Sequence, residues 1–134
     1  MEEKELLVCV MDARNLSFLN NSFDAVTSFF TMMFIDNKDH INVFKEIYRV
    51  LKDDGEFILW DCIIPPYAGD IKDVFVIQLE VLTTTSTIKT GYGVSRIDKY
   101  QDVNYFVRIG EETGFKTVKL EVNDKIFKIV FKKV

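Results

Sequence analysis

The stretch that decides the fold class is residues 41–61, which read INVFKEIYRVLKDDGEFILWD. From Ile41 to Leu51 the apolar residues recur at helical spacing with charged residues between them, so this half predicts an amphipathic helix. Gly55 is predicted to stop the helix, because glycine is favoured just past a helix end. Residues Glu56 to Asp61 form a short apolar run, which is typical of a strand buried on both faces.

Two further strands are predicted before this helix. Leu6–Met11 and Asp24–Phe30 are each a short apolar run beside polar residues, and both suit strands that are buried on both faces. The resulting order is strand, strand, helix, strand, with a helical pattern joining apolar runs. That order indicates an α/β layer fold with a largely parallel sheet.

The pattern is weaker between Tyr67 and Gln101. A helix is predicted around Ile71–Leu82, and the low-complexity stretch Thr83–Thr87 follows it. This third of the chain gives the least information about structure.

The last third again carries clear local signals. Asp102 is a suitable N-cap for a helix that runs through about Thr113, and Gly114 is predicted to end it. Two strands, Lys116–Val122 and Ile126–Phe131, are predicted next as a pair joined by a short polar turn. The C-terminal part is therefore expected to be a helix followed by a hairpin.

The composition fits one soluble folded domain. The chain has 134 residues, of which 48% are hydrophobic and 28% charged, so it can bury one core but not two. The net charge of -4 disfavours a nucleic-acid partner, since it gives no broad attraction for phosphate. A charged N-terminus argues against a signal peptide, and no apolar window approaches the length of a membrane span. We therefore expect a cytoplasmic protein without a membrane partner.

The two cysteines and the single histidine, residue types that are often catalytic or bind metals, are interpreted here as structural residues. Cys9 and Cys62 lie far apart without a second soft ligand near either, so they are interpreted as buried, reduced thiols, and no metal site is predicted. His40, the only histidine, lies in a polar stretch and is predicted to be a solvated or capping residue rather than a base. The run Met32–Phe34 suggests an apolar pocket or an interface.

Three motifs in one order and spacing carry a family resemblance: Val10–Phe18, Ser22–Val26 and Glu46–Lys52. With them the chain resembles a class I S-adenosylmethionine-dependent methyltransferase of the small-molecule kind that includes the ubiquinone and menaquinone biosynthesis enzymes. The resemblance is strong over residues 8–61 and fainter beyond. It implies a partial Rossmann-like methyltransferase sheet, mostly parallel, with an antiparallel C-terminal hairpin.

The resemblance also implies a cofactor site for S-adenosylmethionine. Asp12 occupies the position whose carboxylate accepts a hydrogen bond from the adenine amino group, and the Ala13 N–H would serve a ring nitrogen. Without the resemblance, Asp12 could simply cap the turn that follows. Phe29 and Phe30 fall where the family lines the methionine part of the cofactor, although plain core packing suits two phenylalanines equally well.

The residues 62–101 would be the family's variable insertion, which helps to form the acceptor pocket. Tyr67, Tyr92 and Tyr100 could orient a small-molecule acceptor there, although aromatic residues in such a segment are often only packing residues. The resemblance names no catalytic acid or base. Methyl transfer from a sulfonium needs mainly positioning, because the leaving group is already activated.

One part of the family pattern is missing at the front. Members begin with a strand and a glycine-rich loop that hold the methionine end of the cofactor, yet the first 54 residues here contain no glycine at all. Residues 1–134 are therefore interpreted as a single truncated methyltransferase-like domain. We expect it to be the C-terminal part of an enzyme acting on a small-molecule acceptor, inactive as an isolated chain.

A second class of function stays open beside the first. Without the family's first two strands, Leu6–Met11 and Asp24–Phe30 lose the neighbours that would separate them, and unpaired apolar strand edges are association sites. Asp24–Phe30 is therefore expected to pair with Leu6–Met11 directly or with a second chain across a twofold axis, giving a homodimer. The alternative function is a non-catalytic dimerisation or binding module.

Overall fold

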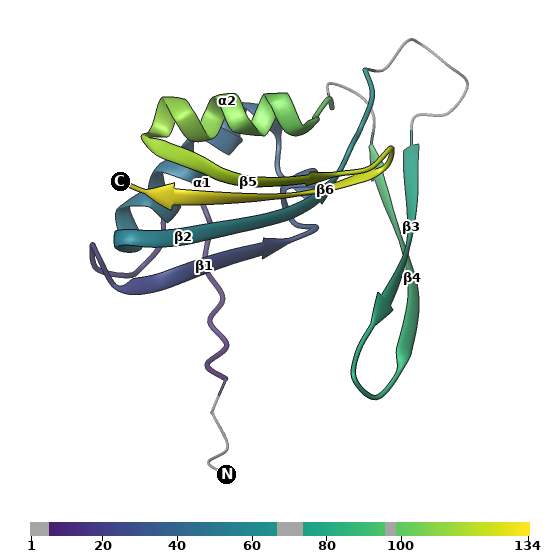
Figure 1. Ribbon diagram of the computed structural model, residues 1–134, viewed down its shortest axis with the longest axis horizontal. Coiled ribbons are helices and arrows are strands. Elements are labelled where there is room, and N and C mark those ends of the chain that lie inside the picture. The colour runs from purple at the N-terminus through teal and green to yellow at the C-terminus, as the bar shows by residue number, and fades with distance from the viewer. Residues whose placement is uncertain (1–5, 67–73, 96–98) are drawn as a thin grey trace.

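The computed structural model describes residues 6–66, 74–95 and 99–134. Within these ranges the chain forms a four-stranded sheet and a separate two-stranded hairpin (Figure 1). The sheet has the strand order β1-β2-β6-β5, with β1 at Phe23–Phe29, β2 at Leu51–Cys62, β6 at Ile126–Lys133 and β5 at Phe115–Val122. The hairpin consists of β3 (Val74–Leu82) and β4 (Thr87–Ser95), and it projects away from the sheet.

Two α-helices cover one face of the sheet: α1 (Asn37–Val50) and α2 (Val103–Thr113). Between them and the strands lies an aromatic core, in which the Phe44 ring of α1 contacts Phe57 of β2 at 5.3 Å and stacks on Phe106 of α2 at 6.0 Å between ring centroids. Neither helix is long and apolar enough to cross a membrane, and the described residues contain no other candidate span.

The elements predicted from the clearest local signals are confirmed. The helix predicted from Ile41 to Leu51 lies within α1 except for Leu51, which begins β2, and the strand Glu56–Asp61 lies within β2. Asp102 caps α2 by accepting a hydrogen bond from the Tyr105 N–H at 2.8 Å, and Gly114 ends it with a φ of 118°. The predicted C-terminal strand pair is the antiparallel hairpin of β5 and β6.

The prediction of a mostly parallel sheet is wrong. Only β1 and β2 pair in parallel, whereas β2 with β6 and β6 with β5 are antiparallel, as are β3 and β4. The cause is the tight β5–β6 turn, in which the Asn123 side chain accepts hydrogen bonds from the Lys125 and Ile126 N–H groups at 2.9 and 2.8 Å. A short turn forces antiparallel pairing, and β6 then inserts beside β2 against its direction. The structure is a mixed α/β sheet with a single parallel pair among the described strands.

The prediction of a strand at Leu6–Met11 is also wrong. These residues form no strand, and Leu6 and Val10 are 87% and 102% exposed. A strand needs a hydrogen-bonded neighbour, and no described strand lies next to this segment. Cys9 is consequently exposed, against its prediction as a buried thiol, whereas Cys62 is buried as predicted.

Strand β1 pairs with β2 on one side only. Its predicted direct pairing with Leu6–Met11 is not found, and among the described residues no strand occupies its other edge. The edge of β1 is therefore open in the described part of the chain.

Gly55 does not stop the first helix, which ends at Val50. It lies inside β2, where the pairing with β1 jumps from Phe23–Leu51 to Ala25–Glu56. A Cβ atom at Gly55 would lie 2.8 Å from the Lys52 carbonyl oxygen and 3.0 Å from that of Asp24. The glycine thus permits a close backbone approach at this irregularity.

The helix predicted around Ile71–Leu82 is wrong where the structure describes it. Residues 74–82 form β3, and residues 71–73 lie outside the described ranges. The segment is rich in β-branched residues, which suit a strand. The Thr83–Ser86 turn returns the chain into β4, with the Thr83 N–H donating to the Ser86 carbonyl at 2.8 Å. The threonine-rich stretch is therefore the turn of a hairpin.

Candidate functional site

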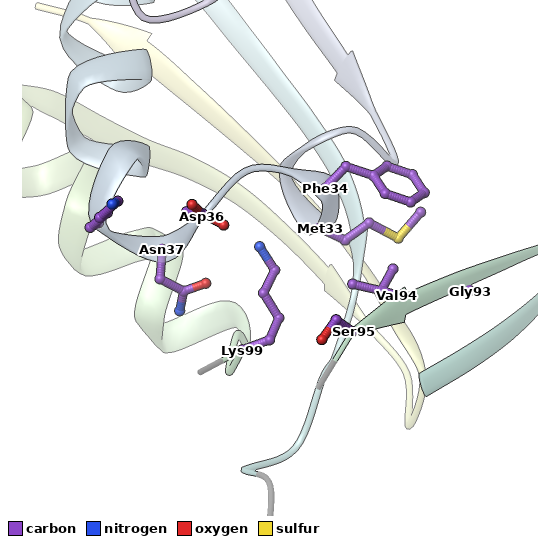
Figure 2. Close-up of a pocket in the computed structure, with 9 residues that line it drawn as sticks. Met33, Phe34, Asp36, Asn37, Gly93, Val94, Ser95 and Lys99 are labelled. Carbon is purple, nitrogen blue, oxygen red and sulfur yellow. The ribbon is translucent and has the colours of Figure 1, made fainter. Parts of the chain in front are cut away.

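Two pockets share a wall at the carboxyl end of β1. We call them the outer pocket, of about 400 Å³, and the inner pocket, of about 580 Å³. Phe34 and Asp36 line both; Phe34 ends the short 3-10 helix η1 (Met32–Phe34), and Asp36 precedes α1. The outer pocket is lined by Met11, Asp12, Ala13, Arg14, Phe34, Ile35, Asp36 and Asp39. The inner pocket is lined by Met33, Phe34, Asp36, Asn37, Lys38, Gly93, Val94, Ser95 and Lys99 (Figure 2).

Asp12 carries the charge on the N-terminal side of the outer pocket. Its carboxylate accepts hydrogen bonds from the Arg14 backbone N–H at 2.8 Å and from the Arg14 guanidinium at 2.7 Å. The hydrogen bond from that guanidinium lowers the pKa of Asp12 to about 2, so the group is an ionised acceptor at neutral pH. Asp12 therefore both caps the turn that follows it and lines a pocket together with Ala13.

Two buried side chains, Lys99 and His40, form hydrogen bonds to the backbone of the shared wall. The Lys99 ammonium donates to the carbonyl oxygens of Met32, at 3.4 Å, and of Ile35. His40 Nε2 lies 2.8 Å from the same Met32 oxygen, and since a carbonyl only accepts, Nε2 carries the proton. His40 Nδ1 then accepts from the Tyr105 hydroxyl at 2.7 Å. Both side chains fix η1, which carries part of the wall.

The prediction that His40 is solvated or a helix cap is wrong. The residue is fully buried within α1, on the core side of the helix. Burial lowers its pKa from 6.5 to about 4, so the imidazole is neutral at physiological pH. Its position on α1 matches the apolar face of that helix, because residues 40, 43, 44 and 47 recur at helical spacing.

Asn37 forms the floor of the inner pocket beside the return from the hairpin. Its Nδ2 donates to the Tyr100 carbonyl at 2.6 Å, while its Oδ1 is buried without a donor among the described residues. The Tyr100 hydroxyl donates to Asp102 at 2.7 Å, at the start of α2. Tyr100 thus contributes its backbone to the neighbourhood of the pocket, and its ring is not part of the lining.

The other predicted site residues lie apart from Asp12 and Ala13. Phe29 and Phe30 line a third pocket, of about 230 Å³, which Trp60 and Leu79 also line. Phe30 is buried with a φ of 52°, and its ring stacks on Tyr92 at 6.2 Å between centroids. The structure therefore gives Phe30 and Tyr92 core-packing contacts, while Phe29 is half exposed. Tyr67 lies outside the described residues.

A buried polar pair, Asp61 and Gln101, attaches the segment before α2 to the sheet. Asp61, at the carboxyl end of β2, accepts hydrogen bonds from the Cys62 N–H at 2.8 Å and from the Gln101 side chain at 2.9 Å. Burial raises the pKa of Asp61. Gln101 also bridges to Ile64 through the backbone in both directions. In the described ranges, no three His, Cys, Asp or Glu side chains gather as metal ligands.

The residues missed by the sequence analysis are Asp36, Asn37 and Lys99. Met33 and Phe34 do line a pocket, as the run Met32–Phe34 suggested. Asp36 and Asn37 begin α1, and an acid or amide before a helix is a usable local signal for its start. Lys99 stands in the weakly patterned third of the chain, and no local pattern marks it as a buried residue.

Known proteins are similar to this chain in sequence and in fold. Residues 2–59 match the family described as "Methyltransferase domain". A protein of Pyrococcus horikoshii OT3 has a similar fold, with a TM-score of 0.66 at 21% identity over 94% of this chain and 58% of that one. A SAM-dependent methyltransferase from Methanosarcina mazei gives a TM-score of 0.68 at 17% identity, over 94% of this chain and 66% of that one.

Geranyl diphosphate C-methyltransferase from Streptomyces coelicolor A3(2), solved with Mg²⁺, geranyl diphosphate and S-adenosyl-L-homocysteine, gives a TM-score of 0.62 at 12% identity. It is covered over 52% of its length and this chain over 94%. These matches confirm the resemblance: the chain has the fold of the class I SAM-dependent methyltransferases over the part of that fold which it spans. That part is 52–66% of the length of these three structures.

One further relative is the enolase of Pelagibacter ubique (strain HTCC1062), which is 30% identical over 112 residues. The match covers 84% of this chain and 24% of that protein. It concerns about a quarter of the enolase, so no enolase activity is carried over to this chain.

Proposed function

We propose that this chain is the C-terminal part of an S-adenosylmethionine-dependent methyltransferase that acts on a small molecule. The supporting observation is the pair of pockets that share Phe34 and Asp36. The outer pocket takes the adenine end of the cofactor and the inner pocket takes the acceptor. In this proposal residues 1–134 are one truncated domain, and 62–101 are its variable insertion, which supplies one side of the acceptor pocket.

The chain's own residues act by binding and orienting. When bound, S-adenosylmethionine supplies an activated methyl group on a sulfonium. The Asp12 carboxylate accepts a hydrogen bond from the adenine amino group and the Ala13 N–H donates to a ring nitrogen. Phe34 and Asp36 separate the adenine end from the acceptor. Correct positioning of two reactants is itself a large part of the rate enhancement, so no acid or base is required of these residues.

The methionine end of the cofactor requires a separate holder. The chain has no glycine before Gly55, so residues 1–54 contain no glycine-rich loop of the kind that lets backbone approach this end. We therefore expect the isolated 134-residue chain to bind the cofactor through its adenine end and not to turn over.

Titration calorimetry with S-adenosylhomocysteine tests the cofactor part of the proposal. We expect saturable one-to-one binding that Asp12→Ala weakens about tenfold or more, because the variant loses a charge-assisted hydrogen bond. Asp24→Ala is the matched control, since Asp24 is an exposed aspartate that only pairs with Lys52 at 3.3 Å. Absence of heat at millimolar ligand, or equal binding by Asp12→Ala, would contradict this assignment.

The alternative function is a non-catalytic dimerisation or binding module, and one observation favours it. Leu6, Leu7, Val8 and Val10 are all more than four-fifths exposed, and the described residues leave one edge of β1 open. Contiguous exposed apolar residues and an open strand edge are association surfaces. The module would form a homodimer through them.

Light scattering over a range of concentrations tests the dimer. We expect the wild-type chain to dimerise and Val8→Lys to be monomeric, because a charge in the exposed apolar segment opposes its burial. Lys38→Glu, on the other side of the shared wall, is the control and should dimerise like the wild type. A wild-type chain that stays a monodisperse monomer at high concentration would refute the homodimer.

A further inference from the structure

Lys99 is a buried cation at the edge of the inner pocket. Its side chain lines the pocket although the residue is only 7% exposed. Burying a charge is costly unless an opposite charge compensates it. The residues that the structure describes place no carboxylate within 4.0 Å of the Lys99 ammonium. Asp36 and Asp61 act on this ammonium from beyond ion-pair distance, so its position for a direct ion pair is open to an anionic ligand.

The present contacts of Lys99 do not neutralise its charge. The ammonium donates to the carbonyl oxygens of Met32 and Ile35, which uses two of its three N–H groups. Carbonyl groups are dipoles, so they orient the ammonium without removing its net charge. Figure 2 shows the Lys99 side chain extending across the pocket between Asn37 and the end of β4, with its nitrogen toward the side of the shared wall. Burial lowers the pKa of Lys99, and the charges of Asp36 and Asp61 offset this effect only in part.

The inner pocket also contains a buried acceptor atom, Asn37 Oδ1, whose hydrogen-bonding capacity is unused by the described residues. Asn37 Oδ1 is buried without a donor among the described residues, although Nδ2 of the same amide is bonded to Tyr100. A buried acceptor that lacks a donor costs free energy, which a ligand donor would recover. Met33, Phe34 and Val94 supply the apolar part of the lining, and Asp36, Lys38 and Ser95 add polar groups to it (Figure 2).

We propose that the inner pocket binds a small carboxylic acid as its anion, with the carboxylate on the Lys99 ammonium and a hydroxyl or amine of the ligand donating to Asn37 Oδ1. The apolar body of the ligand lies against Phe34 and Val94. That this acid is the methyl acceptor rests on the proposed function; that the pocket binds it does not.

The charge around the pocket favours a carboxylate over a phosphate. Lys99 is the only buried cation in the lining, so one negative charge is enough to compensate it. Asp36 stands on the shared wall and repels an anionic ligand, a dianion more strongly than a monoanion, while Lys38 is solvent-exposed and therefore screened. A monoanion fits this balance better than a phosphate dianion does.

The proposal is tested by titrating the ¹⁵N-labelled 134-residue chain with three probes followed by NMR. They are 4-hydroxyphenylacetate, its neutral analogue 4-hydroxyphenylacetamide, and phenyl phosphate. We expect the carboxylate to shift the amide signals of Met33, Gly93, Val94 and Lys99 in a saturable way. The neutral amide should bind about tenfold more weakly or worse, because a hydrogen bond to a charged group is lost.

Variants assign the effect to Lys99. Lys99→Met keeps the length of the side chain without its charge and should lose the preference for carboxylate over amide. Lys99→Arg should retain that preference, and Lys89→Met, which removes an exposed lysine outside the inner pocket, should bind like the wild type. If Lys99→Met fails to fold, the wild-type preference among the three probes still decides the matter.

Several results would overturn the proposal: equal binding of the acid and its amide, stronger binding of phenyl phosphate, no saturable shift with any probe, or full carboxylate preference in Lys99→Met. The probes contain no cofactor, so they report on the inner pocket alone. Titrating the same samples with S-adenosylhomocysteine and following the amides of Asp12 and Ala13 reports separately on the outer pocket. Failure of the carboxylate site and failure of the methyltransferase proposal are thus distinguishable.

Discussion

Two apolar hexapeptides, each containing a cysteine, have opposite environments in this molecule. Residues 6–10 are exposed and Met11 is partly buried, whereas in Phe57–Cys62 the residues Phe57, Leu59 and Cys62 are 0% exposed. The second segment has β1 on one side, β6 on the other and two helices above it. The first pairs with no strand in the described part of the chain. Apolar composition therefore shows that a segment could be buried, but whether it is buried depends on the strands that pair with it.

The largest expected difference between the two segments is the reactivity of their cysteines. Burial raises the pKa of the Cys62 thiol from 9.0 to about 12, and the thiolate is the reactive form. That rise alone lowers its thiolate fraction at neutral pH about a thousandfold. We expect a thiol reagent to label Cys9 rapidly and Cys62 only on unfolding, as measured by mass spectrometry after timed quenching.

Cys9→Ser and Cys62→Ser assign the two rates. Rapid labelling in Cys9→Ser would show that Cys62 is accessible and would break the comparison. Protection of Cys9 that grows with protein concentration would instead show that a second copy covers Leu6–Met11.

The next largest effect concerns stability. Phe57→Ala removes a ring that packs on Phe44, Phe115 and Phe131, so we expect a loss of about 3–5 kcal/mol in the free energy of unfolding. Val8→Ala, in the exposed segment, should change it by less than about 0.5 kcal/mol. Urea denaturation followed by circular dichroism measures both. A similar loss in the two variants would mean that Val8 is buried in solution.

The third effect extends the comparison to charge. Folding lowers the pKa of His40 from 6.5 to about 4, so the unfolded chain binds its proton first as the pH falls. The stabilisation is complete above pH 6.5 and is lost as the pH falls toward 4, up to about 3 kcal/mol. Urea midpoints between these pH values should therefore fall more steeply for the wild type than for His40→Phe.

His40→Phe isolates this contribution because every other titrating group remains. Asp61, whose raised pKa acts in the opposite sense, is present in both proteins and cancels in the difference. Parallel pH profiles for the two proteins would show that His40 is protonated freely in the folded state.

The smallest effect compares two aspartates that make the same kind of cap. Asp102 accepts from the Tyr105 N–H at 2.8 Å at the start of a core helix, and Asp12 accepts from the Arg14 N–H at the same distance in the exposed segment. Asp102→Ala should lose about 1 kcal/mol of stability, a typical N-cap value. Asp12→Ala should lose less stability than Asp102→Ala, since Asp12 is exposed and the turn that it caps packs on the core only through Ala13. Thermal melts of the two variants would reverse this order if the N-terminal segment were part of the core.

The elements that could be predicted from sequence are those with complete local signals. Helix α2 has its cap at Asp102 and its stop at Gly114, and α1 has a full apolar stripe, so neither depends on distant residues. Leu6–Met11 could not be assigned correctly, because a strand is defined by a neighbour that the segment itself does not encode. The antiparallel direction of β6 likewise follows from its insertion between β2 and β5.

The residues of the candidate site also fall into those that the sequence marks locally and those that only tertiary contacts bring together. Asp12 and Ala13 were found through a motif, and they do line a pocket together. Lys99 and Asn37 meet only because the hairpin returns beside the start of α1, 62 residues earlier in the chain. His40 was misplaced because a polar sequence context hides the fact that its position faces the core. The positions of Lys99, Asn37 and His40 in the structure depend on tertiary contacts, which residue type alone does not indicate.

The pairing of β2 with β6 has a consequence for how the chain can fold and change. Glu56 pairs with Lys132, and Cys62 pairs with Ile126. The hairpin, α2 and β5 lie between these two central strands in the sequence, so their pairing closes a long loop. Such non-local pairing slows folding. The entropy of closing a loop, however, grows only with the logarithm of its length. Insertions or deletions in the hairpin should therefore change the stability of the four-stranded sheet little. The same sheet can then support hairpins of different length, and with them pockets of different shape.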